Sequence, residues 1–183
     1  SISQYKLLLE QKIEKPEEIH LNLARLYSEK FYQYQTSHEH LKTALALNPD
    51  YAPAWFNLGN LNEQLGDLGE AKTCFSKVLD IGDENGGALA RIADLTRFED
   101  SGSELIERME NKVRVISNPN PDLMFSLGRA YEQIGDHKKS LNLYESANVI
   151  DWQYLPPYNK DLMTNFFETI CEEYTGEIGK NPN

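Results

Sequence analysis

Apolar residues recur along the chain at the three- and four-residue spacing of amphipathic helices. Leu105, Met109 and Val113 form one such stripe, and a second stripe runs through residues 162–174. Proline and glycine are sparse and lie between these stretches. The pattern therefore predicts helices joined by short connections, with little of the chain left for strands.

The helical pattern is itself repeated. Residues 55–59 (WFNLG) match residues 124–128 (MFSLG) at an offset of 69 positions, which is two periods of 34 and 35 residues. Two series of residues keep this period through the chain: Leu23, Leu58, Ile92 and Leu127, and then Ala44, Val78, Val113 and Ala147. Such a period indicates a solenoid of stacked helical units. The predicted segments are a leading helix in 1–17, four units in 18–51, 52–85, 86–120 and 121–151, and a linker with a C-terminal capping helix in 152–183.

Turn and cap residues predict where the two helices of each unit begin and end. Gly66 suits the end of one helix, and Asp67, followed by a glutamate three residues later, suits the cap of the next. Thr36 and Ser101 are each followed by a glutamate at the same spacing and give the same start signal. Asn48 precedes a proline, which predicts the end of a helix in the first unit.

Two glycines are predicted to lie in helix interiors, where glycine costs about 1 kcal/mol relative to alanine. Gly59 and Gly128 occupy the same position of the repeat. This cost is tolerable where two helix axes approach closely, because a side chain would hold them apart. Ala71 and Ser140 are the predicted small residues facing them on the partner helices.

The order W-x-x-L-G, Gly-Asp, and then a small, an aromatic and another small residue is similar to the tetratricopeptide repeat (TPR) pattern. Residues 52–85 and the unit from Pro121 onward carry it most fully. The resemblance implies an all-α superhelical solenoid of antiparallel helix pairs, with the first helices lining a concave groove. The chain departs from the pattern in three places. Asn62 replaces the usual tyrosine, one extra residue lies in 30–34, and Ile106 occupies a normally small position.

Net charge restricts the partners. The chain has a formal net charge of −11, which repels nucleic acids and anionic membrane surfaces. It also has no run of about 18 apolar residues, so no membrane span is expected. Cys74 and Cys171 are far apart and form no CxxC motif, which favours a reducing, cytoplasmic location.

Nothing in the sequence predicts catalysis. His38 and His40 are two residues apart, which directs them to different sides of a helix, whereas a helical metal pair needs a spacing of three or four. His20 and His137 are expected to be isolated and exposed. No glycine-rich phosphate loop and no nucleophile motif occur. We therefore expect no metal, no cofactor and no enzymatic activity from this segment.

The TPR resemblance implies which residues line the groove. Matched position by position, they are Leu21, Arg25, Phe56, Asn57, Asn60, Glu63, Arg91, Asp94, Arg97, Phe125, Arg129, Glu132 and Gln133. Asparagine can hold peptide amides, and arginine can grip a carboxylate with two parallel bonds. These residues predict a peptide or protein partner, with an acidic or carboxylate-bearing segment favoured, bound by a monomer or weak dimer. The competing interpretations are an ordinary solvated helix face and a binding surface on the convex side.

A finer resemblance concerns residues 15–24, 88–99 and 127–132. They are similar to the repeat region that precedes the catalytic domain of bacterial TPR-containing sulfotransferases. This implies an alternative function, in which a non-catalytic segment presents substrate to a domain beginning after Asn183. A third interpretation is a structural spacer or self-association unit.

Overall fold

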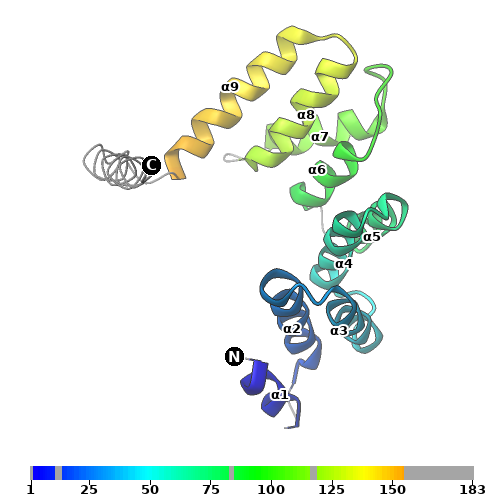
Figure 1. The fold of residues 1–183 in the computed structure, drawn as a ribbon. Helices are drawn as coiled ribbons and strands as arrows, with labels where there is room; N and C mark the ends of the chain where they lie inside the picture. Colours follow the sequence, from blue (N-terminus) through cyan, green and yellow to red (C-terminus); the bar gives the residue numbers. More distant parts are fainter. Residues whose placement is uncertain (1, 11–13, 83–84, 116–118, 155–183) are drawn as a thin grey trace, which may run out of the picture. The chain divides into compact units, whose positions relative to one another are not determined.

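The computed structural model describes residues 2–10, 14–82, 85–115 and 119–154. Within them the chain is helical apart from its connections, and no strand occurs. The helices are α1 (Ile2–Glu10), α2 (Pro16–Phe31), α3 (Tyr34–Leu47), α4 (Ala52–Leu65), α5 (Leu68–Asp80), α6 (Gly86–Asp94), α7 (Glu104–Val115), α8 (Pro121–Gln133) and α9 (His137–Tyr154) (Figure 1). The predicted all-α architecture is confirmed.

The chain divides into two compact parts, Ser1–Ile150 and Asp151–Asn183. Helices of the first part pack on their neighbours in chain order: α2 contacts α3, α3 contacts α4, and α4 contacts α5. The predicted capping stripe in 162–174 lies outside the described residues. None of the described helices combines the length and apolarity that crossing a bilayer requires.

The predicted boundary signals are confirmed at two places. Gly66 ends α4 in the left-handed conformation, with φ of +85°, and the Asp67 carboxylate accepts a hydrogen bond of 3.2 Å from the Glu70 backbone N–H. Asn48 ends α3 with extended backbone, as expected before proline.

The start signals at Thr36 and Ser101 are wrong. Helix α3 begins earlier, at Tyr34, because Tyr32 adopts a left-handed φ of +54° and turns the chain directly into the next helix. Helix α7 begins later, at Glu104, because a turn follows Asp100, whose carboxylate accepts a hydrogen bond of 2.7 Å from the Gly102 backbone N–H.

The second and fourth units share one packing device, in which an aromatic ring lies against a glycine. A Cβ built on Gly59 would come within 2.8 Å of Cδ1 of Phe75, and one on Gly128 would come within 2.8 Å of Cδ1 of Tyr144. Real Cβ atoms essentially never approach another atom that closely. The prediction of a close approach at these glycines therefore holds. The atoms nearest to the new Cβ belong to an aromatic ring in both units, and the predicted small residues, Ala71 and Ser140, are buried on the same partner helices.

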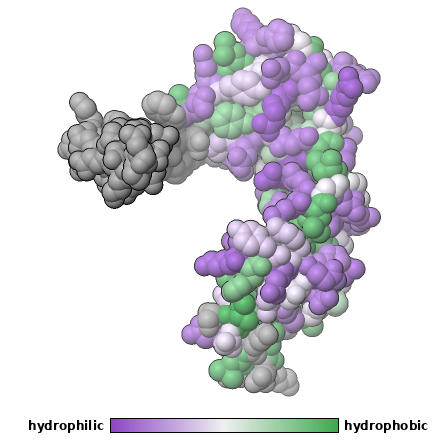
Figure 2. Space-filling model, viewed as in Figure 1, coloured by the Kyte–Doolittle hydropathy of each residue, from purple (hydrophilic) through white to green (hydrophobic). Residues whose placement is uncertain are grey.

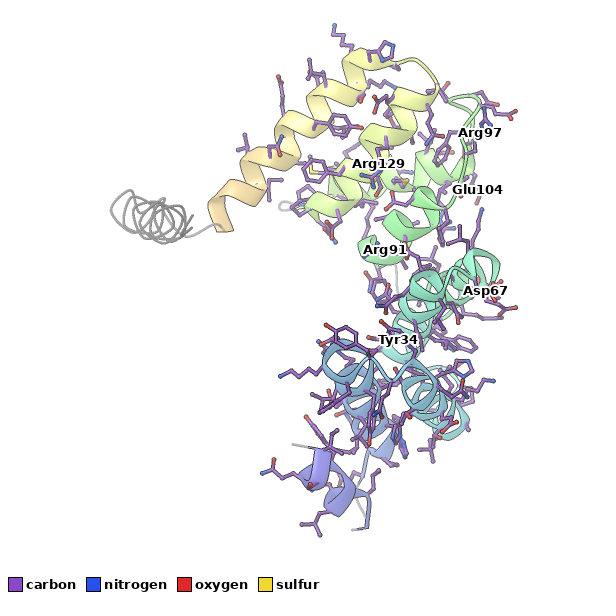
Figure 3. All side chains as sticks on the ribbon, viewed as in Figure 1. Tyr34, Asp67, Arg91, Arg97, Glu104 and Arg129 are labelled. Carbon is purple, nitrogen blue, oxygen red and sulfur yellow. The ribbon has the colours of Figure 1, made fainter. Side chains whose placement is uncertain are left out.

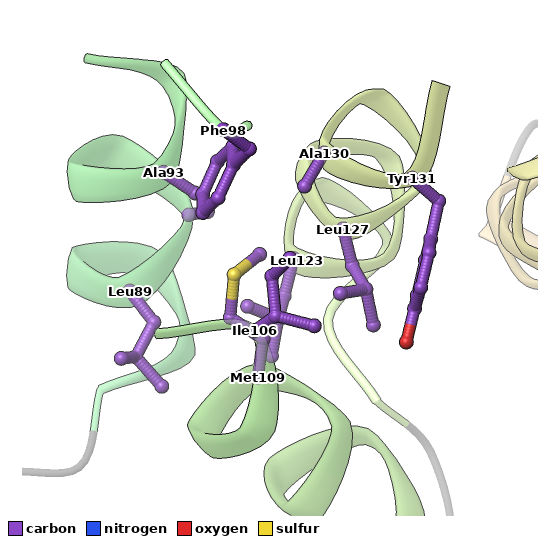
Figure 4. Close-up of a cluster of buried hydrophobic side chains, with 10 residues drawn as sticks. Leu89, Ala93, Phe98, Ile106, Met109, Leu123, Leu127, Ala130 and Tyr131 are labelled. Carbon is purple, nitrogen blue, oxygen red and sulfur yellow. The ribbon is translucent and has the colours of Figure 1, made fainter. Parts of the chain in front are cut away.

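The third unit is built differently. Its first helix, α6, has only nine residues, and the following connection carries Phe98 into the core at 5% exposure. The Phe98 backbone N–H donates a 2.9 Å hydrogen bond to the Gln133 side chain of α8. Ile106, at the normally small position, is also fully buried. Figure 4 shows the resulting cluster, to which α6, α7, α8 and the connection all contribute.

The first unit shows a third variant. Helix α2 has sixteen residues against fourteen in α4, which accommodates the predicted extra residue. Ala24 and Leu41 take the positions of Gly59 and Phe75 and are both buried. The buried Ser37 hydroxyl donates a 2.8 Å hydrogen bond to the Ala24 carbonyl, which ties α3 to α2.

The face seen in Figure 2 is hydrophilic over much of α7–α9 and more apolar near α1 and α2. Leu7 of α1 and Phe31 of α2 are exposed, at 57% and 51%. A hollow of about 510 Å³ lies between these two helices.

Candidate functional site

The predicted groove residues lie on the first helices of the four units. They fall on α2 (Leu21, Arg25), α4 (Phe56, Asn57, Asn60, Glu63), α6 (Arg91, Asp94) and α8 (Phe125, Arg129, Glu132, Gln133). Arg97 does not belong with them, because α6 ends at Asp94. In Figure 3, Arg91 and Arg129 lie on one side of α6 and α8, and Arg97 lies on the other.

Three of these helices enclose a cleft of about 410 Å³. It is lined by Phe56 of α4, by Gly87, Ala90, Arg91 and Asp94 of α6, and by Asp122, Phe125, Ser126 and Arg129 of α8. The structure therefore brings together Phe56, Arg91, Asp94, Phe125 and Arg129 from the predicted set. We call this hollow the α4–α6–α8 cleft.

Sequence reasoning missed four residues of the cleft: Gly87, Ala90, Asp122 and Ser126. A signal for them was present. The α6 residues of the cleft recur in α8 at an offset of 35 positions, since Gly87 matches Asp122 and Arg91 matches Ser126. Residues separated by three or four positions share one face of a helix. The repeat register therefore identifies this face even where the residue types differ.

Ion pairs join the first helices along the cleft. Arg91 of α6 reaches Glu63 of α4 at 3.6 Å, and Arg129 of α8 pairs with Asp94 of α6. Arg129 also donates a 3.0 Å hydrogen bond to the Ser126 hydroxyl. The arginines thus bridge successive units, and each of their charges faces a carboxylate.

Each of the two phenylalanines of the cleft packs against an aromatic ring of the second helix in its unit. The ring of Phe56 lies 5.5 Å from that of Phe75 between centroids, and the ring of Phe125 lies 6.1 Å from that of Tyr144. Phe75 and Tyr144 are the rings that rest on the helix glycines. The same device that packs the second and fourth units therefore positions the aromatic walls of the cleft.

Other predicted groove residues make contacts within the protein. The Asn57 amide donates a 2.8 Å hydrogen bond to the Pro53 carbonyl of its own helix, and Arg25 pairs with Glu29 of α2 at 3.3 Å. Glu132 accepts a 2.9 Å hydrogen bond from the Tyr144 hydroxyl. Leu21 packs against the buried cluster between α2, α3 and α4.

Asn60 differs from these residues. Its Oδ1 atom is buried and has no hydrogen-bond partner among the described residues. Gln133 is engaged through its bond to the Phe98 backbone. Of the predicted groove amides, Asn60 is therefore the one that keeps an unused buried acceptor.

The expectation that His20 is isolated and exposed is wrong. Its Nδ1 lies 2.9 Å from Nδ1 of His40, and the ring of Tyr27 stacks on His40 at 5.5 Å between centroids. Burial lowers the pKa of His20, because it disfavours the charged imidazolium. Among the residues that the structure describes, no three His, Cys, Asp or Glu side chains gather as a metal site would require.

Cys74 is buried between α4 and α5 as a free thiol. Burial raises its pKa to about 11, although the Asn62 amide donates to its Sγ at 3.7 Å. Asn62 stands where the fourth unit has Tyr131. The usual tyrosine is thus replaced by a residue that contacts the thiol, and a thiol with so high a pKa is a poor nucleophile.

Stacked helix pairs and a cleft walled by their first helices define a helical-repeat solenoid protein. Comparison with known proteins specifies the kind of repeat. The family described as "TPR repeat" matches residues 33–66, and the "Tetratricopeptide repeat" family matches residues 52–82 and 121–148. The chain therefore contains tetratricopeptide repeats, and its fold is an all-α TPR solenoid. The third unit lies outside these matches, in keeping with its different packing.

Solved structures share the fold at low sequence identity. A crystal structure of MamA has a TM-score of 0.61 and 21% identity, and the match covers 83% of this chain and 87% of that one. YrrB, described as a TPR protein with an unusual peptide-binding site, has a TM-score of 0.65 and 19% identity, covering 84% and 78%. A putative kinesin light chain from Podosopora anserina has a TM-score of 0.58 and 16% identity, covering 83% and 84%. No curated protein matches the sequence.

Proposed function

We propose that this chain is a protein-interaction scaffold whose concave groove binds a peptide or protein segment. The observation that carries the proposal is the α4–α6–α8 cleft. Its floor is made of small residues, Gly87 and Ala90, and its walls are the half-buried rings of Phe56 and Phe125. A hollow of a few hundred Å³ that places aromatic rings beside charged and polar groups has the size of a typical binding site and can make both apolar and polar contacts.

The cleft is also held in shape before a partner arrives. Its rings are supported by Phe75 and Tyr144, and its polar rim is fixed by the ion pairs between successive units. A surface whose side chains are already ordered loses little conformational entropy on binding. This favours binding in the groove over binding on faces whose side chains are free to move.

The fold comparison gives independent support. YrrB shares the fold and is described as having a peptide-binding site. The same kind of ligand is therefore reasonable for this chain. As predicted from the sequence, we expect the scaffold to act as a monomer or weak dimer, which light scattering would measure.

The resemblance to sulfotransferase repeat regions stays a prediction from the sequence. In that case the same groove would hold the substrate polypeptide for a catalytic domain encoded beyond Asn183. Reading the gene beyond this position tests the prediction directly, because the domain would need a strand followed by a phosphate-binding loop and a helix.

The groove is tested by affinity enrichment from a cell lysate with mass spectrometry. The bait proteins are the wild type, Phe125→Ala, and Leu143→Ala as a matched control. Both residues are half-buried and belong to the fourth unit, but Leu143 lines a different hollow with Glu110 and Val113. Circular dichroism melting first establishes that all three proteins are folded.

We expect a partner that the wild type and Leu143→Ala retain equally and that Phe125→Ala loses by about tenfold or more, as is typical of a buried aromatic at an interface. A partner lost with Leu143→Ala but kept with Phe125→Ala would place binding on the second helices. That result would refute the groove.

A further inference from the structure

The arginines of the α4–α6–α8 cleft are not available to a ligand carboxylate. Arg91 is paired with Glu63, and Arg129 with Asp94. An incoming carboxylate would have to break one of these pairs and would leave a second carboxylate beside it. Like charges at contact distance disfavour binding. The geometry therefore argues against the acidic partner that the arginines suggest in the sequence.

Asp122 provides the opposite chemistry. It lines the same cleft, is exposed, and lies in the first turn of α8, where the Asn120 side chain accepts a 2.9 Å hydrogen bond from its backbone N–H. No cation of the described chain lies within ion-pair distance of its carboxylate. With a net charge of −11 on the whole sequence, the long-range field also attracts cations.

The floor of the cleft adds an apolar requirement. Ala90 is 3% exposed, and a Cβ on Gly87 would come within 3.4 Å of Cζ of Phe56. The small residues thus keep open a space that the ring of Phe56 borders directly. Phe125 borders the same cleft from α8, next to Asp122 on the same helix face.

We infer that the α4–α6–α8 cleft binds a peptide segment in which a lysine or arginine adjoins an apolar side chain. The cation pairs with Asp122, and the apolar side chain lies over Gly87 and Ala90 between Phe56 and Phe125. This inference rests on the proposed function of the groove and adds the chemistry of its partner. The ion pairs of Arg91 and Arg129 stay intact and reject acidic segments.

Three fluorescein-labelled peptides test the inference by fluorescence anisotropy. Each carries one leucine, which is flanked on both sides by two lysines, two serines or two glutamates. We expect the lysine peptide to bind at least about fivefold more tightly than the serine peptide, and the glutamate peptide to bind most weakly. Salt should weaken the lysine peptide, because the Asp122 contact is exposed.

The position of the cation is tested by Asp122→Asn, with Glu107→Gln as the matched control. Both substitutions remove one negative charge from an exposed side chain in the first turn of a helix, but Glu107 of α7 does not line the cleft. We expect Asp122→Asn to weaken binding of the lysine peptide by about three- to tenfold, because an exposed charge pair contributes only modestly to affinity. Glu107→Gln should change its affinity less than twofold.

The outcomes separate the two proposals. Equal losses with Asp122→Asn and Glu107→Gln would show attraction by net charge alone and would overturn the inference, as would equal or tighter binding of the glutamate peptide, or no binding of any peptide below about 1 mM. Phe125→Ala tests the groove itself. If it weakens all three peptides equally and no charge preference exists, the groove stands and its inferred chemistry fails. If it has no effect on a lysine-selective interaction, the proposed groove fails.

Discussion

The second and fourth units pack an aromatic ring of the second helix against a glycine of the first helix. The third unit has a buried core of a different composition. Across the three units, Gly59, Ala93 and Gly128 occupy one position of the repeat. The facing position holds Phe75, Glu110 and Tyr144. In the third unit this ring is therefore missing, and the buried aromatic side chain of its core is Phe98, which comes from the connection after α6.

This difference teaches that the two positions change together. A ring needs a glycine opposite it, because any Cβ there would overlap the ring. Once the ring is replaced by Glu110, the glycine is no longer required and alanine, the better helix former, takes its place. Glu110 then turns to a new role, accepting from the Tyr131 hydroxyl and lying 3.8 Å from Lys139 Nζ.

The largest expected effect comes from removing either kind of ring. Phe75→Ala and Phe98→Ala should each lower the free energy of unfolding by about 3–5 kcal/mol, because both side chains are buried and would leave a cavity. Urea unfolding measures this, with the exposed Leu141→Ala as a control expected to cost less than about 1 kcal/mol. A small loss for Phe98→Ala alone would show that the third unit does not depend on its connection.

The glycine contact gives the next largest effect. Gly59→Ala and Gly128→Ala should each destabilise the protein by about 1–3 kcal/mol through overpacking, although alanine is the better helix former. Gly69→Ala of α5 is the matched control, since its new Cβ would meet nothing closer than 3.9 Å. Thermal unfolding should show that this control is neutral or stabilised by up to about 1 kcal/mol. Unchanged stability at Gly59 and Gly128 would contradict the ring contact.

The hydrogen bond between Glu110 and Tyr131 should contribute less. A double-mutant cycle with Glu110→Ala and Tyr131→Phe is expected to give a coupling of about 0.5–1.5 kcal/mol, because each change removes one partner of the bond. The matched comparison is Tyr144→Phe, which removes an exposed hydroxyl contact to Glu132 in the fourth unit. A coupling near zero would mean that this hydrogen bond does not stabilise the contact between α7 and α8.

The smallest expected effect is a pH dependence of stability in the first unit, where His20 lies next to His40. Because burial lowers the pKa of His20, the unfolded chain binds the proton at higher pH than the folded chain. Stability is therefore lost as pH falls below about 6.5, the ordinary pKa of histidine. His38 contributes in the same direction, since burial lowers its pKa too, so His20→Asn should flatten the pH dependence only in part. Proton NMR titration of the ring signals checks the assignment, and a His20 midpoint above about 6.5 would contradict it.

Repeat period, helix pairs and turn glycines were predictable because each depends on residues close together in the sequence. Gly59 and Gly128 could be recognised by their cost within a helix, but the sequence did not show which of the nearby large residues lies directly on each glycine. Which residue faces a glycine depends on the rotation of the partner helix. Phe98 could not be found for a similar reason, since it belongs to no helical stripe and enters the core from a connection.

In the candidate site, too, some features could be predicted from the sequence and others depended on how the helices pack. The repeat register correctly placed the candidate residues on the first helices, apart from Arg97, because α6 ends at Asp94. The pairing of Arg91 with Glu63, and of Arg129 with Asp94, could not be foreseen, because it depends on the offset between neighbouring units to within a few ångströms. The charge that we infer for a partner rests partly on these pairs, and so that inference required the structure.

The buried thiol of Cys74 can be used to measure how often α4 and α5 separate. Alkylating reagents attack the thiolate, and burial raises the pKa of Cys74 to about 11, so the buried thiol is protonated at pH 8. The sulfur of Cys74 is also buried between α4 and α5, so the reagent can reach it only when these helices separate. In a Cys171→Ser background, the labelling rate therefore reports how often the second unit opens. Since each unit of a solenoid contacts mainly its neighbours, that rate should rise when the adjoining third unit is weakened.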